Sequence, residues 1–261
     1  MNNAYYLVLF SLIFSHYCSL FFNQRNNKIF DLHIFFLILF IGFRHKVGGD
    51  WGTYQGLLFE NKYLTLSEFF STVTLNSFGY KLFIWIFSSF DLGVFFLNLL
   101  SASVFMIGVR ILVYNFNYRY LALILAFPTL IVIVGMGFTK QSVAIGFFLI
   151  AFDSLLKQQN KKYVFYVVIA SLFHLSALVF LILIFSRKKY FLIILFIFMT
   201  LIYVLYSYSK FIYILNSINF YSYIKNYVLY EVVTSNGANL RIILNIIPTF
   251  LLLIFYNHFY M

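Results

Sequence analysis

Ionisable residues are scarce in this chain, and their scarcity decides the class of protein before any motif does. Asp, Glu, Lys and Arg make up 10% of the 261 residues, whereas 63% are hydrophobic and 23% are aromatic. A soluble globule of this size needs more polar surface than such a composition supplies. The sequence therefore predicts an integral membrane protein.

Further absences exclude several kinds of chemistry. Cys18 is the single cysteine, which excludes intramolecular disulfides and cysteine-based metal sites. The five histidines show no i, i+3 or i, i+4 pairing, so they indicate no metal site. The sequence holds no P-loop, dinucleotide fingerprint or nucleophile elbow. The net charge of +11 does not indicate nucleic-acid binding, because the cations lie in short clusters between apolar runs.

Nine apolar runs are present, and a helix needs about 20 residues to cross a bilayer. They cover about residues 5–22, 29–43, 78–90, 93–114, 120–138, 141–156, 163–185, 190–206 and 241–258. Several are short, so we expect about seven to nine hydrophobic segments, some of them re-entrant or broken. The predicted fold class is all-α: a polytopic helical membrane bundle formed by one domain over residues 1–261, with two long extracytoplasmic loops at about 44–77 and 207–240.

The distribution of basic residues predicts one of the broken segments. If all nine runs crossed the bilayer, the clusters Lys157–Lys162 and Arg187–Lys189 would lie on opposite sides, against the positive-inside tendency. The run between them is interrupted at His174, and two half-helices meeting there would return both clusters to the cytoplasm. Broken helices of this kind are tolerated where they line a cavity. We expect a re-entrant hairpin with His174 at its apex, and we interpret 78–90 as re-entrant or interfacial.

In this predicted topology, several cations lie on the extracytoplasmic side of the membrane. The positive-inside tendency does not explain them there. Anion binding is one explanation, and the weak charge preference of long loops is another. The eight outward cations are Arg44, Lys46, Lys62, Lys81, Lys140, Lys210, Lys225 and Arg241.

The stretch 41–59 holds the densest group of ionisable residues, together with five glycines. Cations there suit a diphosphate, and glycines let backbone N–H groups approach a ligand. An ordinary basic flank of a membrane helix explains the same residues. Plain structural roles also remain open elsewhere: helix capping by Thr139, packing of His174 and snorkelling of Arg241.

Four segments, in order along the chain, resemble the EpsG family, whose members are similar to Wzy O-antigen and capsular polysaccharide polymerases. The first is FRHKVGGDWGTYQGLLFE, the family's loop signature. TKQSVAIGFFLIAF resembles the family's Arg-Gln-Ala helix start, with Lys140 in place of arginine. IASLFHLSALVF matches the stretch with the characteristic histidine at His174, and GANLRIILNIIP resembles a late helix that opens with Arg241.

The resemblance implies a membrane glycosyltransferase in the bacterial inner membrane. Such an enzyme joins undecaprenyl-diphosphate-linked oligosaccharide repeat units on the extracytoplasmic face, as in lipopolysaccharide and capsule biosynthesis. The reaction requires no metal and no cofactor. The implied partners are the lipid-linked oligosaccharides, membrane lipids, and a chain-length regulator and a flippase of the same pathway. Two alternatives stay open: a lipid-linked oligosaccharide flippase or transporter, and a non-catalytic component of a polysaccharide assembly complex.

The resemblance also implies roles for individual residues. We expect His174 or Asp50 to accept the proton of the acceptor hydroxyl. We expect three cations to bind the diphosphates: Arg44, Lys140 and Arg241. Two aromatic residues, Trp51 and Tyr54, are expected to stack on sugars. Three further residues are expected to support the site: Gly48, Gly49 and Gln141.

Overall fold

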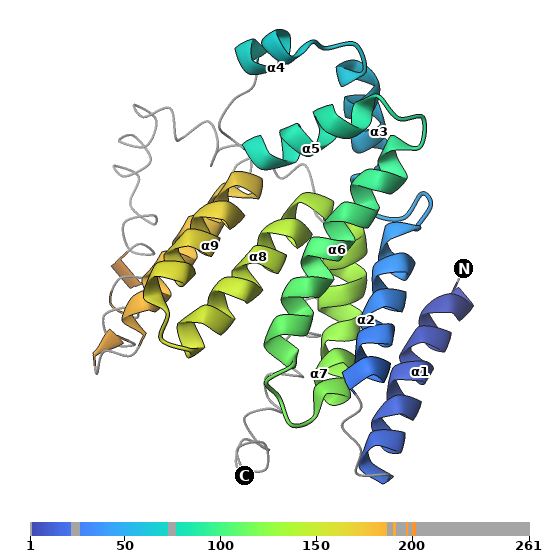
Figure 1. Ribbon diagram of the computed structural model, residues 1–261, viewed down its shortest axis with the longest axis vertical. Helices are drawn as coiled ribbons and strands as arrows, with labels where there is room; N and C mark the ends of the chain where they lie inside the picture. The colour runs from blue at the N-terminus through green and yellow to red at the C-terminus, as the bar shows by residue number, and fades with distance from the viewer. Residues whose placement is uncertain are drawn as a thin grey trace. The chain divides into compact units, whose positions relative to one another are not determined.

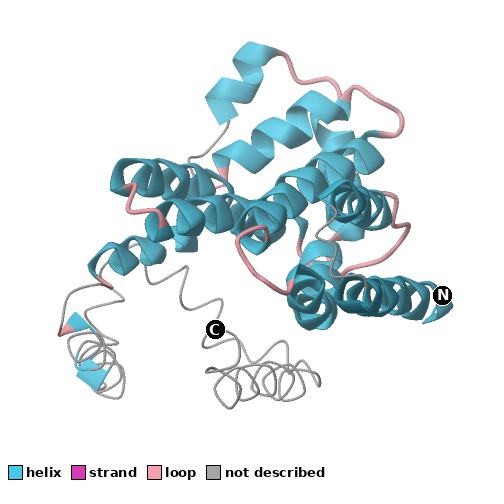
Figure 2. Cartoon of the chain, turned by 60° about the horizontal axis from the view of Figure 1, so that its bottom comes forward, coloured by secondary structure: helices cyan, strands magenta, loops and turns pink. Residues whose placement is uncertain are grey.

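The computed structural model describes residues 2–21, 27–72 and 77–186, together with residues 190, 191, 197, 200 and 201. The chain divides into two compact units, residues 1–181 with 254–261 and residues 182–253. The contacts below all lie in the first unit. Within the described residues every element is a helix and none is a strand (Figure 2). The all-α prediction is therefore confirmed for this part of the chain, while the single-domain prediction stays a prediction.

Among the described residues, four helical stretches are long and apolar enough to cross a membrane. They are Asn3–Phe21 within α1 (Asn2–Phe21), α6 (Gly93–Val113), Arg119–Met136 and α8 (Thr139–Leu156). The third combines α7 (Arg119–Ala126) with a π-helix, η1 (Phe127–Met136). These four coincide with apolar runs of the sequence. The runs at 190–206 and 241–258 lie outside the continuously described residues.

The helices α2 (Asn27–Gly42) and α6 pack antiparallel, while α6 and α8 run parallel to each other (Figure 1). Small residues bring α6 and α8 together. A Cβ on Gly108 would overlap the carbonyl oxygen of Gly146, and a Cβ on Gly146 would lie 2.7 Å from the carbonyl oxygen of Val104. Membrane helices approach closely where such small residues face each other. This crossing fixes the spacing of two helices that also carry site residues.

Three short helices cover the end of the bundle where α2 ends and α6 and α8 begin (Figure 1). They are α3 (Trp51–Asn61), α4 (Leu66–Thr72) and α5 (Phe78–Ser88). The predicted long connection at 44–77 contains two short helices, α3 and α4, neither of which is long enough to cross a bilayer, and its extracytoplasmic side stays a prediction. Trp51, Tyr54 and Leu58 form a buried face at helical spacing. The short helix α5 agrees with a re-entrant or interfacial segment, since its 11 residues are too few to span a bilayer.

The break predicted at His174 is confirmed. Helix α9 (Asn160–Phe173) stops there, His174 is extended (φ −150°, ψ 110°), and a 3₁₀-helix, η2 (Leu175–Phe185), follows. The chain then turns back, because the Tyr163 hydroxyl near the start of α9 donates to the Phe180 carbonyl in η2. His174 lies at the apex of this hairpin.

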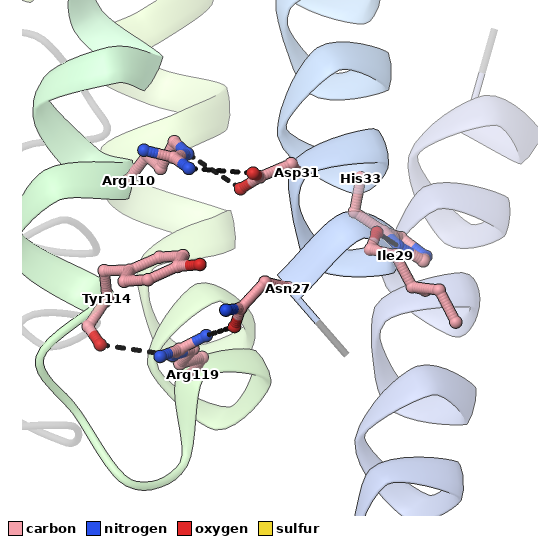
Figure 3. A network of polar contacts seen from close by, with 7 residues as sticks. All are labelled: Asn27, Ile29, Asp31, His33, Arg110, Tyr114 and Arg119. Atoms are coloured by element: carbon pink, nitrogen blue, oxygen red, sulfur yellow. Dashed lines mark hydrogen bonds and ion pairs between the residues drawn. The ribbon is translucent and has the colours of Figure 1, made fainter. Parts of the chain in front are cut away.

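The opposite end of the bundle is fixed by a polar network (Figure 3). Arg110 on α6 donates from Nε and Nη2 to the two carboxylate oxygens of Asp31 on α2, both at 2.7 Å. Arg119 donates to the Asn27 side chain and lies 3.8 Å from the centre of the Tyr114 ring. Bidentate pairing gives this end a defined geometry and compensates the charge of Arg110.

Candidate functional site

Arg44 lies at the centre of the candidate site and is almost fully buried, with 6% of its surface exposed. Nη1 donates to the carbonyl oxygens of Ile41 (3.0 Å) and Gly135 (3.3 Å). Nη2 donates to the Asn98 side-chain oxygen (2.8 Å) and to the Thr139 hydroxyl (2.7 Å). One guanidinium therefore joins the end of α2, the start of α6, the end of η1 and the start of α8.

The charge of Arg44 has no carboxylate partner among the described residues. Its four acceptors are two carbonyls, an amide and a hydroxyl, all neutral. Burial lowers the pKa of Arg44 to about 10, so the guanidinium stays charged at neutral pH. Its Nε is buried and meets no hydrogen-bond partner in the described part of the chain. Because buried charges are normally paired, this arrangement favours an anion at the site.

The loop that carries Arg44 packs tightly against the segment that joins η1 to α8. Gly48 has a φ of +97°, a conformation that suits glycine. A Cβ at this position would lie 2.5 Å from the Met136 carbonyl oxygen. The loop signature and the segment before α8 are thus in contact, although about 90 residues of sequence separate them. Gly49 differs, since a Cβ there would have no described atom within 4 Å.

Asp50 and Tyr54 form the next part of the site. The Tyr54 hydroxyl donates to Asp50 Oδ2 at 3.0 Å. Burial, and then the nearby carboxylate of Asp50, raise the pKa of Tyr54, which keeps the phenol protonated. Tyr80 lies beside Tyr54, with ring centres 5.0 Å apart. The Tyr80 hydroxyl is buried and has no well-formed hydrogen bond to the described residues.

Lys140 and His174 are the remaining two predicted residues of the cluster. Lys140 follows Thr139 in the first turn of α8, is half-buried, and has no carboxylate within ion-pair distance in the described part of the chain. His174 is half-buried and lies outside the four helices suited to membrane spans. Its pKa is lowered by burial and then by the charge of Lys140, which favours the neutral imidazole. The structure therefore brings Arg44, Asp50, Tyr54, Lys140 and His174 into one region.

The two predicted sugar-stacking residues are buried, and the third predicted cation is not described by the structure. Trp51 and Tyr54 are buried, and Trp51 packs against His45 and Phe95. Their rings offer no free face here, so sugar stacking on them stays a prediction. Gln141 is half-buried beside Lys140. Arg241 lies outside the described residues.

Two further residues belong to the cluster, Asn98 and Tyr80, and neither is predicted from the sequence. Asn98 is 1% exposed and accepts from Arg44, while its Nδ2 has no partner in the described region. A lone amide inside an apolar helix was the available signal. Tyr80 gave no comparable signal, since tyrosine is abundant throughout this chain. No three His, Cys, Asp or Glu side chains gather as a metal-ligand set within the described residues.

Comparison with known proteins gives one finding. The model of the family described as EpsG matches residues 27–261, which is most of the chain. No curated protein and no solved structure matches the chain. The matched range includes every site residue named above.

Proposed function

The chain belongs to the EpsG family, and we propose that it is a glycosyltransferase of polysaccharide biosynthesis that joins undecaprenyl-diphosphate-linked repeat units. Family membership supports a polymerase-like function in an integral membrane protein. The observation that carries the proposal further is the buried charge of Arg44, which has only neutral acceptors and lies beside Lys140. Two cations without carboxylate partners in the described region suit a diphosphate.

In the proposed reaction, a hydroxyl of one repeat unit attacks the anomeric carbon of the other. The new glycosidic bond forms as the bond from that carbon to the diphosphate oxygen breaks, and undecaprenyl diphosphate leaves with the bonding electrons. Negative charge develops on the leaving group, so a cation that binds it more strongly in the transition state accelerates the step. The acceptor proton passes to His174, with Asp50 as the alternative base.

We propose different tasks for the two described cations, because their surroundings differ. The terminal N–H groups of Arg44 are taken by protein acceptors, and only Nε–H is left for a ligand among the described contacts. Lys140 is more exposed than Arg44 and forms no ion pair within the described residues. We assign the first contact with the diphosphate to Lys140. Arg44 holds Thr139, and hence the start of α8, in place and adds its charge. Arg241 stays the proposed third cation.

The test is complementation of a strain that lacks the protein, read from the banding of surface polysaccharide on a gel. Lys140→Ala and His174→Ala should abolish the ladder of long chains and leave single repeat units on the lipid. Lys46→Ala is the matched control, because Lys46 is an exposed lysine in the loop that carries Arg44. Membrane levels of each variant are measured in parallel, so that a loss of protein is not scored as a loss of activity.

The same experiment separates the alternatives. Repeat units that stall on the cytoplasmic side in the His174→Ala strain would indicate a flippase. An unchanged ladder in both variants at normal protein level would contradict the enzymatic proposal and favour a non-catalytic component.

A further inference from the structure

A cavity of about 200 Å³ lies where α3 meets the turn between α5 and α6, apart from the Arg44 cluster. We call it the rim pocket. Its floor is formed by buried side chains of Leu58, Val94 and Ser88. The pocket is open on one side, and this space accommodates one small ring.

Aromatic rings and planar polar groups line the upper part of the rim pocket. Phe59 and Phe90 line the pocket, and 73% and 52% of their surfaces are exposed. Lys62 and Asp91 face each other across the opening, with Nζ and Oδ1 3.4 Å apart, and Gln55 adds an amide. The pocket therefore combines an apolar floor, two aromatic rings, and both donors and acceptors.

The ion pair at the rim does little for stability. The Asp91 side chain is 95% exposed, and exposed pairs contribute about 0–1 kcal/mol. Because Lys62 and Asp91 compensate each other, the rim does not select an anion. Its chemistry fits a neutral ligand with several hydroxyl groups and one apolar face.

The local backbone holds the rim residues in place. The Phe90 N–H donates to the Phe87 carbonyl, and the Gly93 N–H donates to the Phe90 carbonyl. A Cβ on Gly93 would overlap the Phe87 carbonyl oxygen, so this turn requires glycine. The turn presents Phe90 and Asp91 at the pocket edge before α6 begins.

Helix α3 connects the rim pocket with the proposed reaction site. Gln55 lines the pocket and directly follows Tyr54, which binds Asp50. At a rise of about 1.5 Å per residue, Lys62 lies about 12 Å along the helix axis from Tyr54. A ligand that extends from the reaction site along α3 therefore reaches the pocket.

We propose that the rim pocket is a subsite for one neutral sugar ring of the oligosaccharide. The assignment to a polymerase subsite rests on the proposed function, whereas sugar binding by the pocket is measurable without catalysis. The sugar packs its C–H face on Phe90 or Phe59, and its hydroxyls bind Asp91, Lys62 and Gln55.

The experiment measures binding of the delipidated single repeat unit to the purified full-length protein by isothermal titration. Phe90→Ala and Asp91→Asn should each weaken binding about two- to tenfold, the loss of one modest contact. Matched controls are Phe70→Ala on α4 and Glu60→Gln on the outer side of α3, since both residues are exposed and neither lines the pocket. Asp91→Asn changes an exposed side chain, so folding is preserved in at least one test variant.

Wild-type affinity in both pocket variants, or no binding by the wild type, would overturn the sugar subsite. Failure of the proposed function looks different: surface polysaccharide would stay unchanged when the protein is removed, while the pocket variants would still weaken binding in the titration. If both proposals hold, the pocket variants also shorten the chains by raising the KM for the repeat unit.

Discussion

At the scale of single residues, Arg44 is a buried cation whose position is set by four neutral acceptors. Its contacts with Asn98 and Thr139 explain how a loop signature and a distant helix start can act together. The sequence indicated that Arg44 and Lys140 belong to one site, because the family resemblance includes both. It did not indicate that Arg44 is covered by protein, since burial depends on how α2, α6, η1 and α8 meet.

Thr139→Val tests the hydrogen bond that joins Arg44 to α8. The substitution keeps the shape of the side chain but removes the acceptor of Nη2, 2.7 Å away. Leaving a buried N–H unsatisfied costs about 1–3 kcal/mol, so thermal unfolding in detergent should begin at lower temperature. Thr139→Ser keeps the hydroxyl and should unfold like the wild type. Equal unfolding temperatures for Thr139→Val and the wild type would show that the bond is not required.

The pH dependence of polymerisation tests the pairing of His174 with Lys140. Burial and the charge of Lys140 both lower the pKa of His174 below 6.5, so the imidazole remains neutral, and able to accept a proton, to lower pH. The acid limb of the rate profile should therefore lie below pH 6.5. In Lys140→Gln the cation is gone, the pKa of His174 rises, and the limb should move to higher pH even though the overall rate falls.

Rates measured in isolated membranes across pH 5 to 8, about the range in which histidine titrates, give this profile. If the acid limb stays in place or moves to lower pH in Lys140→Gln, it does not report a His174 base whose pKa is lowered by Lys140.

At the scale of helices, the sequence predicted the apolar helices well and the polar-aromatic stretch poorly. The runs at 93–114 and 141–156 match α6 and α8 to within two residues at each end. The stretch 44–77 is predicted only as a long connection between membrane segments, because its glycines and charges conceal the helical period of α3 and α4. A usable signal was present, since Thr65 and Glu68 form a capping box in which the Thr65 N–H donates to Glu68 at 2.8 Å.

The crossing of α6 and α8 gives a prediction at this scale. Gly146→Leu would force the helices apart, because even a Cβ at Gly146 would lie 2.7 Å from the Val104 carbonyl oxygen. Overpacking costs about 1–3 kcal/mol or more, and we expect a lower unfolding temperature in detergent together with a loss of long polysaccharide chains. Gly56→Ala is the control, since a Cβ there has no described atom within 4 Å. It should keep or slightly raise the stability, as alanine is the better helix former. Wild-type stability of Gly146→Leu would mean that the two helices are not in close contact.

At the scale of the described bundle, the two ends differ in how their cations are compensated. Away from α3–α5, Arg110 pairs with Asp31, and Lys157 pairs with Asp153. At the end covered by α3–α5, Arg44 and Lys140 have no carboxylate within ion-pair distance in the described region, although Lys62 pairs with Asp91. At this end, Arg44 and Lys140 are therefore the cations whose charge is left to attract an anion, whereas Lys62 is compensated by Asp91.

The sequence could not predict this difference, because ion pairs such as Arg110–Asp31 join residues far apart in the chain. Composition and run lengths determine that the helices form, whereas the faces that meet depend on packing. The hairpin at His174 is an exception, since the positions of the two basic clusters and the polar interruption at His174 predicted that the chain turns back there.

Binding of undecaprenyl diphosphate to the purified protein tests most directly whether the Arg44–Lys140 cluster is a diphosphate site. Removing one charged hydrogen bond costs about 1.5–3 kcal/mol, so Lys140→Gln should weaken binding about tenfold or more, while Lys46→Gln should leave the affinity unchanged. Equal affinities of Lys140→Gln and the wild type would contradict the account.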